Sequence, residues 1–393
     1  CTFQSPPIAG YVPGSRVAAQ SAIDHYQKDI ETALAASPAD FTGASTWYAF
    51  LSDTEMYERC PACPYKHYMM FYDYYGSHTY ADDWVSAALT GTDMSFSSGK
   101  HGPNNFAVLG EAARIEAVKK GTAYLIVWMH VIRELEDAVD DCRNCTSCWR
   151  SRHSVHSWDE GVAYYTGSLE GTAHGGDGDG KLLYRLAEKR CANFGTCLES
   201  GTGATGTSQV NSELFQLFDR GRDWLQQGRC SSMRPLVNQI VSLMTVPLVQ
   251  GALRYAYKNS KAGTDMASPK NAAEGATFSA AVLPLVHHCN AASAAVVSDN
   301  LKFGLFPSGG TADTSRYSDF AAVKSAFEDV YACLGITCAQ VGGLIQATDA
   351  GVNTAAACTF QSPPLAGYVP GSHVAAQSGI DHFQQDIETA LAA

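Results

Sequence analysis

The sequence predicts an all-α fold, a disulfide-stapled multi-helix domain with long loops and little or no β structure. Through much of the chain, apolar residues recur every three to four positions, the periodicity of helices that bury one face. No segment of five to eight residues alternates clearly between apolar and polar side chains, as a half-buried strand would. The 13 cysteines are spread along the 393 residues, which is typical of a protein with several disulfides.

The N-terminal part is expected to be an extended segment followed by a helix. Residues 2–14 are rich in proline and glycine, and Ser15 is suited to cap the helix after them. Apolar side chains in that helix form one stripe at helical spacing: Ile23, Tyr26, Ile30 and Leu34.

The remaining helices are predicted from the same periodicity. Pro247 and Pro284 are expected to kink or break the helices that contain them. Further helices are predicted over residues 44–58, 105–141, 157–169, 181–193, 208–228, 232–259, 269–302, 316–332 and 338–346.

The first 36 residues occur twice. Residues 1–36 and 358–393 differ at five positions only: Ile8/Leu365, Arg16/His373, Ala22/Gly379, Tyr26/Phe383 and Lys28/Gln385. Such similarity indicates a tandem repeat, although one protein with a duplicated end remains the alternative. We predict a complete helical unit over residues 1–357 and the start of the next unit over 358–393. Within the unit we expect a docking segment with the first helix (1–36), a helical core (37–346) and a linker (347–357).

The repeat predicts self-assembly. Two nearly identical segments need the same docking groove, so the second copy is expected to dock on a neighbouring unit. Head-to-tail docking does not close on itself and therefore builds filaments. The first functional hypothesis is thus a secreted, non-enzymatic tandem-repeat protein that assembles with itself into an extracellular fibre. The predicted assembly interface is the apolar stripe of both copies: Ile23, Tyr26, Ile30, Leu34, Ile380, Phe383, Ile387 and Leu391.

Charge and apolar patterning exclude several partners. The net charge of −12 argues against binding to nucleic acid or to anionic membrane surfaces. The longest apolar run, residues 240–253, is too short to span a bilayer, so no membrane insertion is expected.

The cysteines indicate an oxidising compartment, either extracellular or in the periplasmic and cell-wall space. Cys1 and Cys358 occupy the same repeat position, which leaves an even number of cysteines in each unit. Short spacing favours three local bridges, although connectivity cannot be derived from sequence: Cys60–Cys63, Cys191–Cys197 and Cys333–Cys338. The other candidates are Cys142, Cys145, Cys148, Cys230 and Cys289. Zinc bound by two Cys-x-x-Cys pairs, Cys60/Cys63 and Cys142/Cys145, is the alternative.

No enzyme signature is present, so we expect no catalytic residues and no required cofactor. The candidate non-protein groups are iron and an N-glycan on Asn144, which begins the sequon Asn-Cys-Thr. Asp177 and Asp179 resemble the start of a calcium loop but lack the later ligands, and we interpret them as a turn.

Three groups of residues have the spacing of metal ligands on helices. His130, Glu134 and Asp137 should share one face of a long helix, and Arg133 lies beside them. The other two groups are the pair His156 and Glu160 and the pair Glu55 and Glu58. Carboxylates and imidazoles at such spacings hold iron and other transition ions in helical bundles. Taken singly, each group is explained more simply by a solvated acidic face or a satisfied core histidine.

An aromatic-rich stretch over residues 65–75 has three interpretations. Its Tyr and Met side chains suit a hydrophobic core, a subunit interface or phenolate ligands of ferric iron. We rank the core and the interface above ligation.

Three nearby stretches stand out: residues 158–171 (WDEGVAYYTGSLEG), 179–184 (DGKLLY) and 189–197 (KRCANFGTC). They resemble the algal Fe-assimilating proteins, also described as low-iron-inducible or high-CO2-inducible periplasmic proteins. The resemblance implies a secreted helical protein at an algal cell surface, associated with iron uptake and with no known catalytic step. It is therefore the basis of the alternative hypothesis, iron binding that aids iron assimilation.

The resemblance also implies short acidic iron motifs of the E-x-x-E and R-E-x-x-E types. Glu55 and Glu58 match the first motif. Residues 133–137 match the second, except that Asp137 stands in place of the last Glu and its shorter side chain reaches less far.

Overall fold

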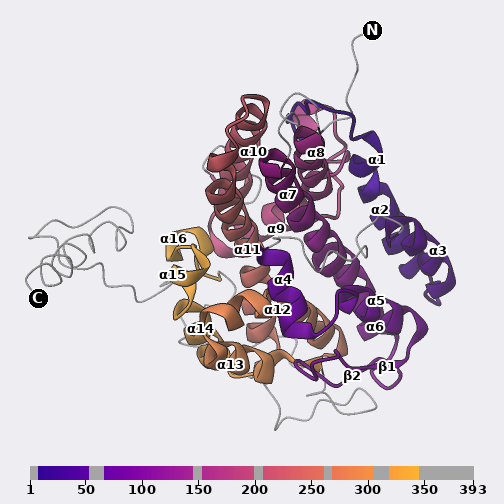
Figure 1. The fold of residues 1–393 in the computed structure, drawn as a ribbon. Helices are drawn as coiled ribbons and strands as arrows, with labels where there is room; N and C mark the ends of the chain where they lie inside the picture. The colour runs from indigo at the N-terminus through magenta and orange to yellow at the C-terminus, as the bar shows by residue number, and fades with distance from the viewer. Residues whose placement is uncertain are drawn as a thin grey trace, which may run out of the picture.

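The computed structural model describes residues 8–52, 66–144, 153–198, 207–260, 268–303 and 318–344, and it confirms the all-α prediction (Figure 1). Among these residues the only sheet is a two-stranded antiparallel one, formed by β1 (Asp93–Met94) and β2 (Asn104–Asn105).

Helices account for most of the rest. The first half of the chain forms α1 (Ala18–Ser21), α2 (Ile23–Leu34), α3 (Phe41–Ser52), α4 (Lys66–Tyr75), α5 (Tyr80–Thr90), α6 (Glu111–Gly121), the π-helical turn η2 (Thr122–Ile126), α7 (Val127–Asn144) and α8 (His153–Thr166). The second half forms η3 (Thr172–His174), α9 (Leu183–Phe194), α10 (Gln209–Gln226), η4 (Cys230–Ser232), α11 (Met233–Lys258), α12 (Pro269–Cys289), α13 (Ala291–Leu301), α14 (Phe320–Glu328), α15 (Tyr331–Leu334) and α16 (Cys338–Val341).

Two local expectations about helix ends were wrong, and the structure excludes one of the two effects expected of the prolines, a break in the helix. Ser15 does not cap a helix, because its hydroxyl donates to Asp159 instead. Pro247 and Pro284 lie inside α11 and α12 without ending them. The predicted helix 269–302 breaks instead at Asn290, whose backbone is extended and whose side chain accepts hydrogen bonds from the first turn of α13.

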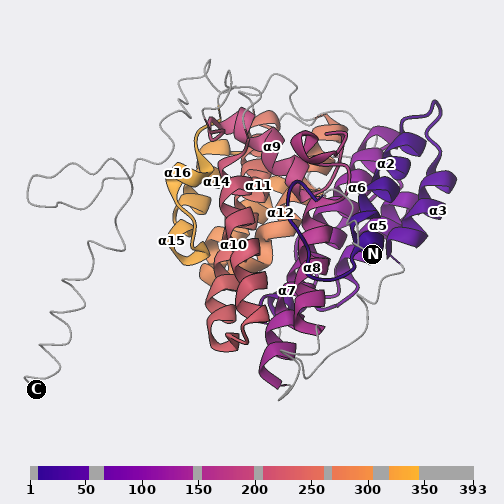
Figure 2. The same cartoon turned by 90° about the horizontal axis from the view of Figure 1, so that it is seen from above.

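The core is built around α11 and α12, which pack against each other at the centre of the bundle (Figures 1 and 2). Helices α6, α4 and α13 contact α12, whereas α7, α9, α10 and α14 contact α11. A helix that is apolar on all sides is stable only when it is surrounded. The segment Cys230–Lys258 is long and apolar enough to cross a membrane, but 83% of its most apolar window is buried inside the protein.

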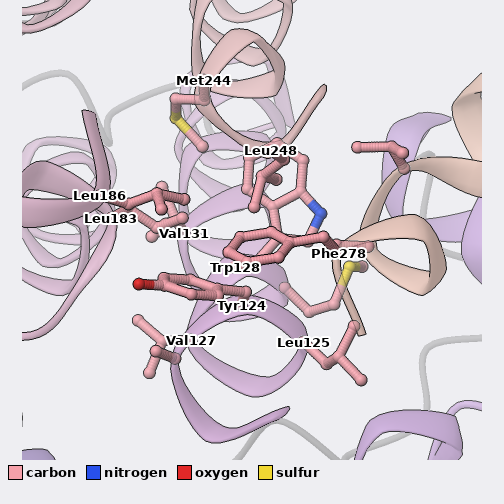
Figure 3. Close-up of a cluster of buried hydrophobic side chains, with 14 of the residues drawn as sticks. Tyr124, Leu125, Val127, Trp128, Val131, Leu183, Leu186, Met244, Leu248 and Phe278 are labelled. Carbon is pink, nitrogen blue, oxygen red and sulfur yellow. The ribbon is translucent and has the colours of Figure 1, made fainter. Parts of the chain in front are cut away.

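Aromatic rings fill the space between the central helices and α7. Figure 3 shows Trp128 of α7 beside Tyr124, Leu248 and Phe278. The Tyr124 and Phe278 rings stack with their centroids 5.0 Å apart. A Cβ atom at Gly251 would collide with the Phe278 ring, so only glycine allows α12 to approach α11 this closely.

The aromatic stretch belongs largely to this core. Tyr68, Phe71, Tyr74 and Tyr75 of α4 are buried, and the Tyr75 hydroxyl donates to the Ala280 carbonyl at 2.7 Å. The interpretation as core therefore holds for these four side chains.

Disulfides in the described residues include one local bridge and two long-range ones. Cys191–Cys197 is present as predicted. The predicted Cys333–Cys338 pair is wrong, because α15 packs against the end of α12 and Cys333 is bonded to Cys289. Cys338 is also disulfide-bonded. The candidates that lie outside the described residues are Cys1, Cys60, Cys63, Cys145, Cys148 and Cys358.

The third bridge joins Cys142 at the end of α7 to Cys230 at the start of α11, with the two Cα atoms 5.4 Å apart. The thiol of Cys142 is therefore not available as a zinc ligand, which removes one of the ligands in the alternative zinc site.

A buried carboxylate ties α7 to two neighbouring helices. Glu136 is fully buried, and its oxygens accept hydrogen bonds from the backbone N–H groups of His67 (3.0 Å) and Tyr68 (3.2 Å) in α4. Arg234 of α11 adds an ion pair at 2.6 Å. Breaking such a pair leaves an uncompensated charge in the interior.

We expect Glu136→Gln to lower the free energy of unfolding by about 3–5 kcal/mol, because Arg234 then loses its buried carboxylate. Chemical denaturation monitored by circular dichroism measures this change. Glu328→Gln removes a partly exposed pair with Lys324 and should cost less than about 1 kcal/mol. Equal losses in the two variants would contradict a structural role for Glu136.

Candidate functional site

Acidic and histidine side chains line the contact between α7 and α8, which lie side by side (Figures 1 and 2). The two helices are antiparallel, so residue numbers rise along α7 where they fall along α8. The His130 ring of α7 lies 5.1 Å from the Tyr164 ring of α8. Near the other end, the Ser157 hydroxyl of α8 donates to Asp137 of α7 at 3.1 Å.

We call this arrangement the α7–α8 ladder. It consists of His130, Glu134, Asp137 and Asp141 from α7 and of Tyr164, Glu160, Ser157 and His153 from α8. Each helix contributes one residue per turn, so the side chains of one helix meet those of the other in sequence. The predicted group His130/Glu134/Asp137 is therefore brought close to Glu160 of the predicted pair His156/Glu160, although the two groups lie on different helices.

A π-helical turn precedes the ladder directly. Residues Thr122–Ile126 form η2 between α6 and α7. A π turn holds more residues than an α turn and so rotates the next helical segment about the helix axis; such turns are frequent at functional sites. In this protein η2 lies between α6 and α7, so the face of α7 that carries the ladder does not continue a face of α6.

The electrostatic centre of the ladder is Glu134. Its side chain is nearly buried, with 8% of the residue surface exposed. Burial first, then the negative charges of Glu160 and Asp137, raise its pKa to about 8, although the neighbouring Arg133 opposes the shift. Glu134 therefore holds a proton at neutral pH, which lets two carboxyl groups approach each other away from water.

The histidine next to Glu134 along α7 is uncharged. His130 is buried, and burial together with the positive charge of Arg133 lowers its pKa to about 3. A neutral imidazole is the form that binds metal ions. Arg133 Nη1 in turn donates to Glu134 Oε1 at 3.0 Å.

Glu160 has two further partners. His156 Nε2 lies 3.3 Å from its Oε1, one helical turn away. Gln20 of α1 donates to the same oxygen at 2.6 Å. The ladder is therefore in contact with the repeated N-terminal segment.

That segment is fixed to α8 by a buried aspartate that sequence reasoning missed. Asp159 is fully buried and accepts hydrogen bonds from the hydroxyl groups of Tyr11 (2.5 Å) and Ser15 (2.7 Å). The Ser15 hydroxyl also lies 3.1 Å from His156 Nδ1. No sequence pattern pointed to this role, because Asp159 lies between the two residues of the His156/Glu160 pair and is not part of it.

The apolar stripe of the first copy packs within its own unit. Ile23, Ile30 and Leu34 are buried, and Tyr26 stacks against Trp47 and Phe50 of α3 with centroid distances of 6.4 and 5.8 Å. The equivalent residues of the second copy, Ile380, Phe383, Ile387 and Leu391, lie outside the described residues. The assembly interface stays a prediction.

The structure describes only some of the other predicted site residues. Glu55 and Glu58 lie outside the described residues, and Asn144 is the last residue of α7 with its side chain not described. Asp179 forms an ion pair with Lys28 at 2.7 Å in a turn. Across the described parts of the chain, no group of three or more His, Cys, Asp or Glu side chains is arranged to hold a metal ion. Metal binding at the ladder therefore requires side-chain rotation.

Comparison with known proteins identifies the family. No curated protein and no solved structure gives a significant match. A family model described as "Low iron-inducible periplasmic protein" matches residues 2–362, which includes both ladder helices and the docking segment. The match agrees with the resemblance noted in residues 158–197 and with the expected periplasmic location. The chain therefore belongs to the family of low iron-inducible periplasmic proteins.

Proposed function

We propose that the protein binds iron at the α7–α8 ladder and so aids iron assimilation in the periplasmic space. The observation that carries this proposal is the packing of α7 against α8, which puts Glu134 and Glu160 close enough for the charge of Glu160 to raise the pKa of Glu134. Each glutamate has a histidine one turn earlier on its own helix, His130 and His156 respectively. Carboxylate and imidazole groups from facing helices form a common type of iron site.

The electrostatics favour a cation at this point. Two carboxylates in a poorly hydrated place repel each other unless a positive charge lies between them. In the structure a proton and the Arg133 guanidinium supply that charge. An iron ion brings more charge than a proton and accepts both carboxylates as ligands, so it can replace the proton once the side chains turn toward it.

The surroundings of the ladder support binding rather than catalysis. The sequence contains no enzyme motif, and Glu136, the neighbouring carboxylate on α7, is already used to hold α4 and α11. Glu134 and Asp137, the other carboxylates of the R-E-x-x-E-like motif, accept hydrogen bonds from Arg133 and Ser157 and are the ones that we assign to a metal ion. A shortened last ligand, Asp137 instead of Glu, fits a site that binds iron and later releases it.

The double variant Glu134→Gln/Glu160→Gln should abolish stoichiometric iron binding, because amides replace both central carboxylates. Equilibrium dialysis against Fe(II) without oxygen, and against chelated Fe(III), followed by metal analysis, measures the stoichiometry. Asp219→Asn on α10 is the control, since its carboxylate pairs with Arg222 at the surface. It should leave binding unchanged.

A further experiment distinguishes iron binding at the ladder from iron binding at the predicted Glu55/Glu58 pair. Glu55→Gln/Glu58→Gln removes the E-x-x-E carboxylates and should leave ladder binding intact. If this variant loses the iron and the ladder variant keeps it, the proposed position of the site is wrong.

Binding of Fe(II) should strengthen as the pH rises toward about 8, because Glu134 must lose its proton before it can act as a ligand. Below that pH the proton competes, and affinity should change roughly tenfold per pH unit. Above it the dependence should level off. Competition with a coloured chelator between about pH 6 and 9 measures the profile. In Glu134→Gln any remaining binding should lack this dependence, and an unchanged profile would contradict the assignment of Glu134.

A second candidate function is docking between units, and a separate observation supports it. Tyr11, Ser15, Gln20 and Asp24 of the first copy make hydrogen bonds to the rest of its unit. These four residues recur as Tyr368, Ser372, Gln377 and Asp381, whereas Lys28, which pairs with Asp179, is replaced by Gln385. We propose that the second copy uses the same contacts on another unit, as the fibre hypothesis requires.

Self-association should therefore depend on the second copy. The full chain should gain mass with concentration in light scattering, and the variant Tyr368→Ala/Asp381→Ala should remain monomeric because it loses two buried docking hydrogen bonds. Phe383→Tyr restores the residue of the first copy and serves as the control that still associates. A full chain that is monomeric at all concentrations would contradict docking between units.

A further inference from the structure

A basic cavity lies where α11 ends and α12 begins, away from the ladder. Its volume is about 540 Å³. Arg254 and Lys258 reach it from the last turns of α11, and Lys270 reaches it from the first turn of α12. Three cations around one cavity are notable in a chain whose net charge is −12.

The carboxylate in the lining of this cavity is already neutralised. Glu274 lies 3.5 Å from Lys120 Nζ. The neighbouring Glu116 pairs with Lys120 (3.5 Å), Lys119 (3.6 Å) and Lys270 (3.7 Å). Glu31 pairs with Lys119 as well (3.9 Å), so three lysines and three glutamates balance within this group, and Arg254 and Lys258 add positive charge to the cavity.

A further buried cation lies behind the cavity. Arg190 is buried, and its guanidinium lies 6.0 Å from the centroid of the Tyr255 ring, which lines the cavity. Burial lowers the pKa of Arg190, and the charge of Arg254 lowers it further. The positive potential at the cavity therefore comes from both its lining and its interior wall.

Hydrogen-bond donors around the cavity lack acceptors. Arg254 Nε and Asn271 Nδ2 are buried and have no hydrogen-bond partner among the described residues. Asn271 has 3% of its surface exposed and lines the cavity. Buried donors are normally satisfied, so unsatisfied ones beside a cavity indicate a missing acceptor.

The dipole of α12 adds to the same preference. Helix α12 has 21 residues, and Lys270 and Asn271 of its first turn line the cavity. Pro269 has no N–H group, and the N–H groups of Asn271 and Ala272 donate to Ser268, so the contribution is the positive end of the helix dipole rather than free backbone donors.

We propose that this cavity binds a small multivalent oxyanion. Phosphate and a polycarboxylate such as citrate share the required chemistry: at least two negative charges, and several oxygens that accept hydrogen bonds. Arg254 and Asn271 would donate to these oxygens, and Lys258 and Lys270 would balance the charge. The site does not depend on the iron proposal, because it shares no residue with the ladder.

Isothermal titration calorimetry of the full chain at low ionic strength, with inorganic phosphate and with citrate as separate ligands, tests the proposal. We expect one saturable site for at least one of them, and the tighter ligand identifies the oxyanion class. Arg254→Met should weaken binding at least about tenfold, because one charge-assisted donor is lost. Lys270→Met should weaken it too, and since the Lys270 side chain is 58% exposed, this variant should fold normally.

The matched control is Lys100→Met. Lys100 lies over the Tyr74 ring, and its charge acts on His287 near the opposite end of α12, roughly 27 Å along the helix from Pro269. This variant should bind as the original chain does. If neither ligand gives saturable binding, or if Arg254→Met and Lys270→Met bind like the Lys100→Met control, the proposal is wrong.

Discussion

Helix α7 contacts different surroundings on three sides, and the rest of the structure depends on these three sets of contacts. One side carries Trp128 into the aromatic core between α11 and α12. A second side places Glu136 against α4 and α11, where backbone N–H groups and Arg234 hold its charge. The third side turns Glu134 toward α8. Since the first two contacts fix the rotation of the helix, Glu134 starts on the side that faces α8 and is nearly buried there.

This constraint explains why Glu134 retains a proton while Glu136, two residues later, does not need one. Both side chains are buried, so burial alone favours the neutral form of each. Glu136 meets His67 and Arg234, which hold its pKa below its usual range in spite of burial. Glu134 meets Glu160 and Asp137, which raise its pKa together with burial. The difference lies in the neighbours that the fold supplies, and it separates a structural carboxylate from the one to which we assign metal binding.

The sequence predicted well the features that depend on local spacing and poorly those that depend on contacts between distant segments. The helical face shared by His130, Glu134 and Asp137 is set by residue spacing on one helix, and so is the Cys191–Cys197 bridge, which spans only six residues. The roles of Glu134 and Glu136 could not be read from the sequence, because both lie in the same acidic motif and only their neighbours from other helices, such as Arg234 and Glu160, distinguish them. Likewise, Cys333 is close in sequence to Cys338, but the packing of α15 on α12 brings it to Cys289. The basic cavity forms between α11 and α12. These were predicted as separate helices, and nothing in their residue spacing showed that their donors would lie together.

The repeated segment and the ladder meet at a single carboxylate, which makes docking and binding interdependent. Gln20 donates to the same Glu160 oxygen that His156 approaches, and Ser15 joins His156 to Asp159. A docked segment therefore restricts the rotation of Glu160 and His156, the two α8 side chains that must turn toward an incoming ion. The second copy contains the same Gln and Ser, as Gln377 and Ser372. Whichever copy occupies α8 presents the same polar atoms to the ladder, so exchange of segments between units would leave each ladder chemically the same. A tandem chain with this property can link its units without changing the proposed iron site in any of them.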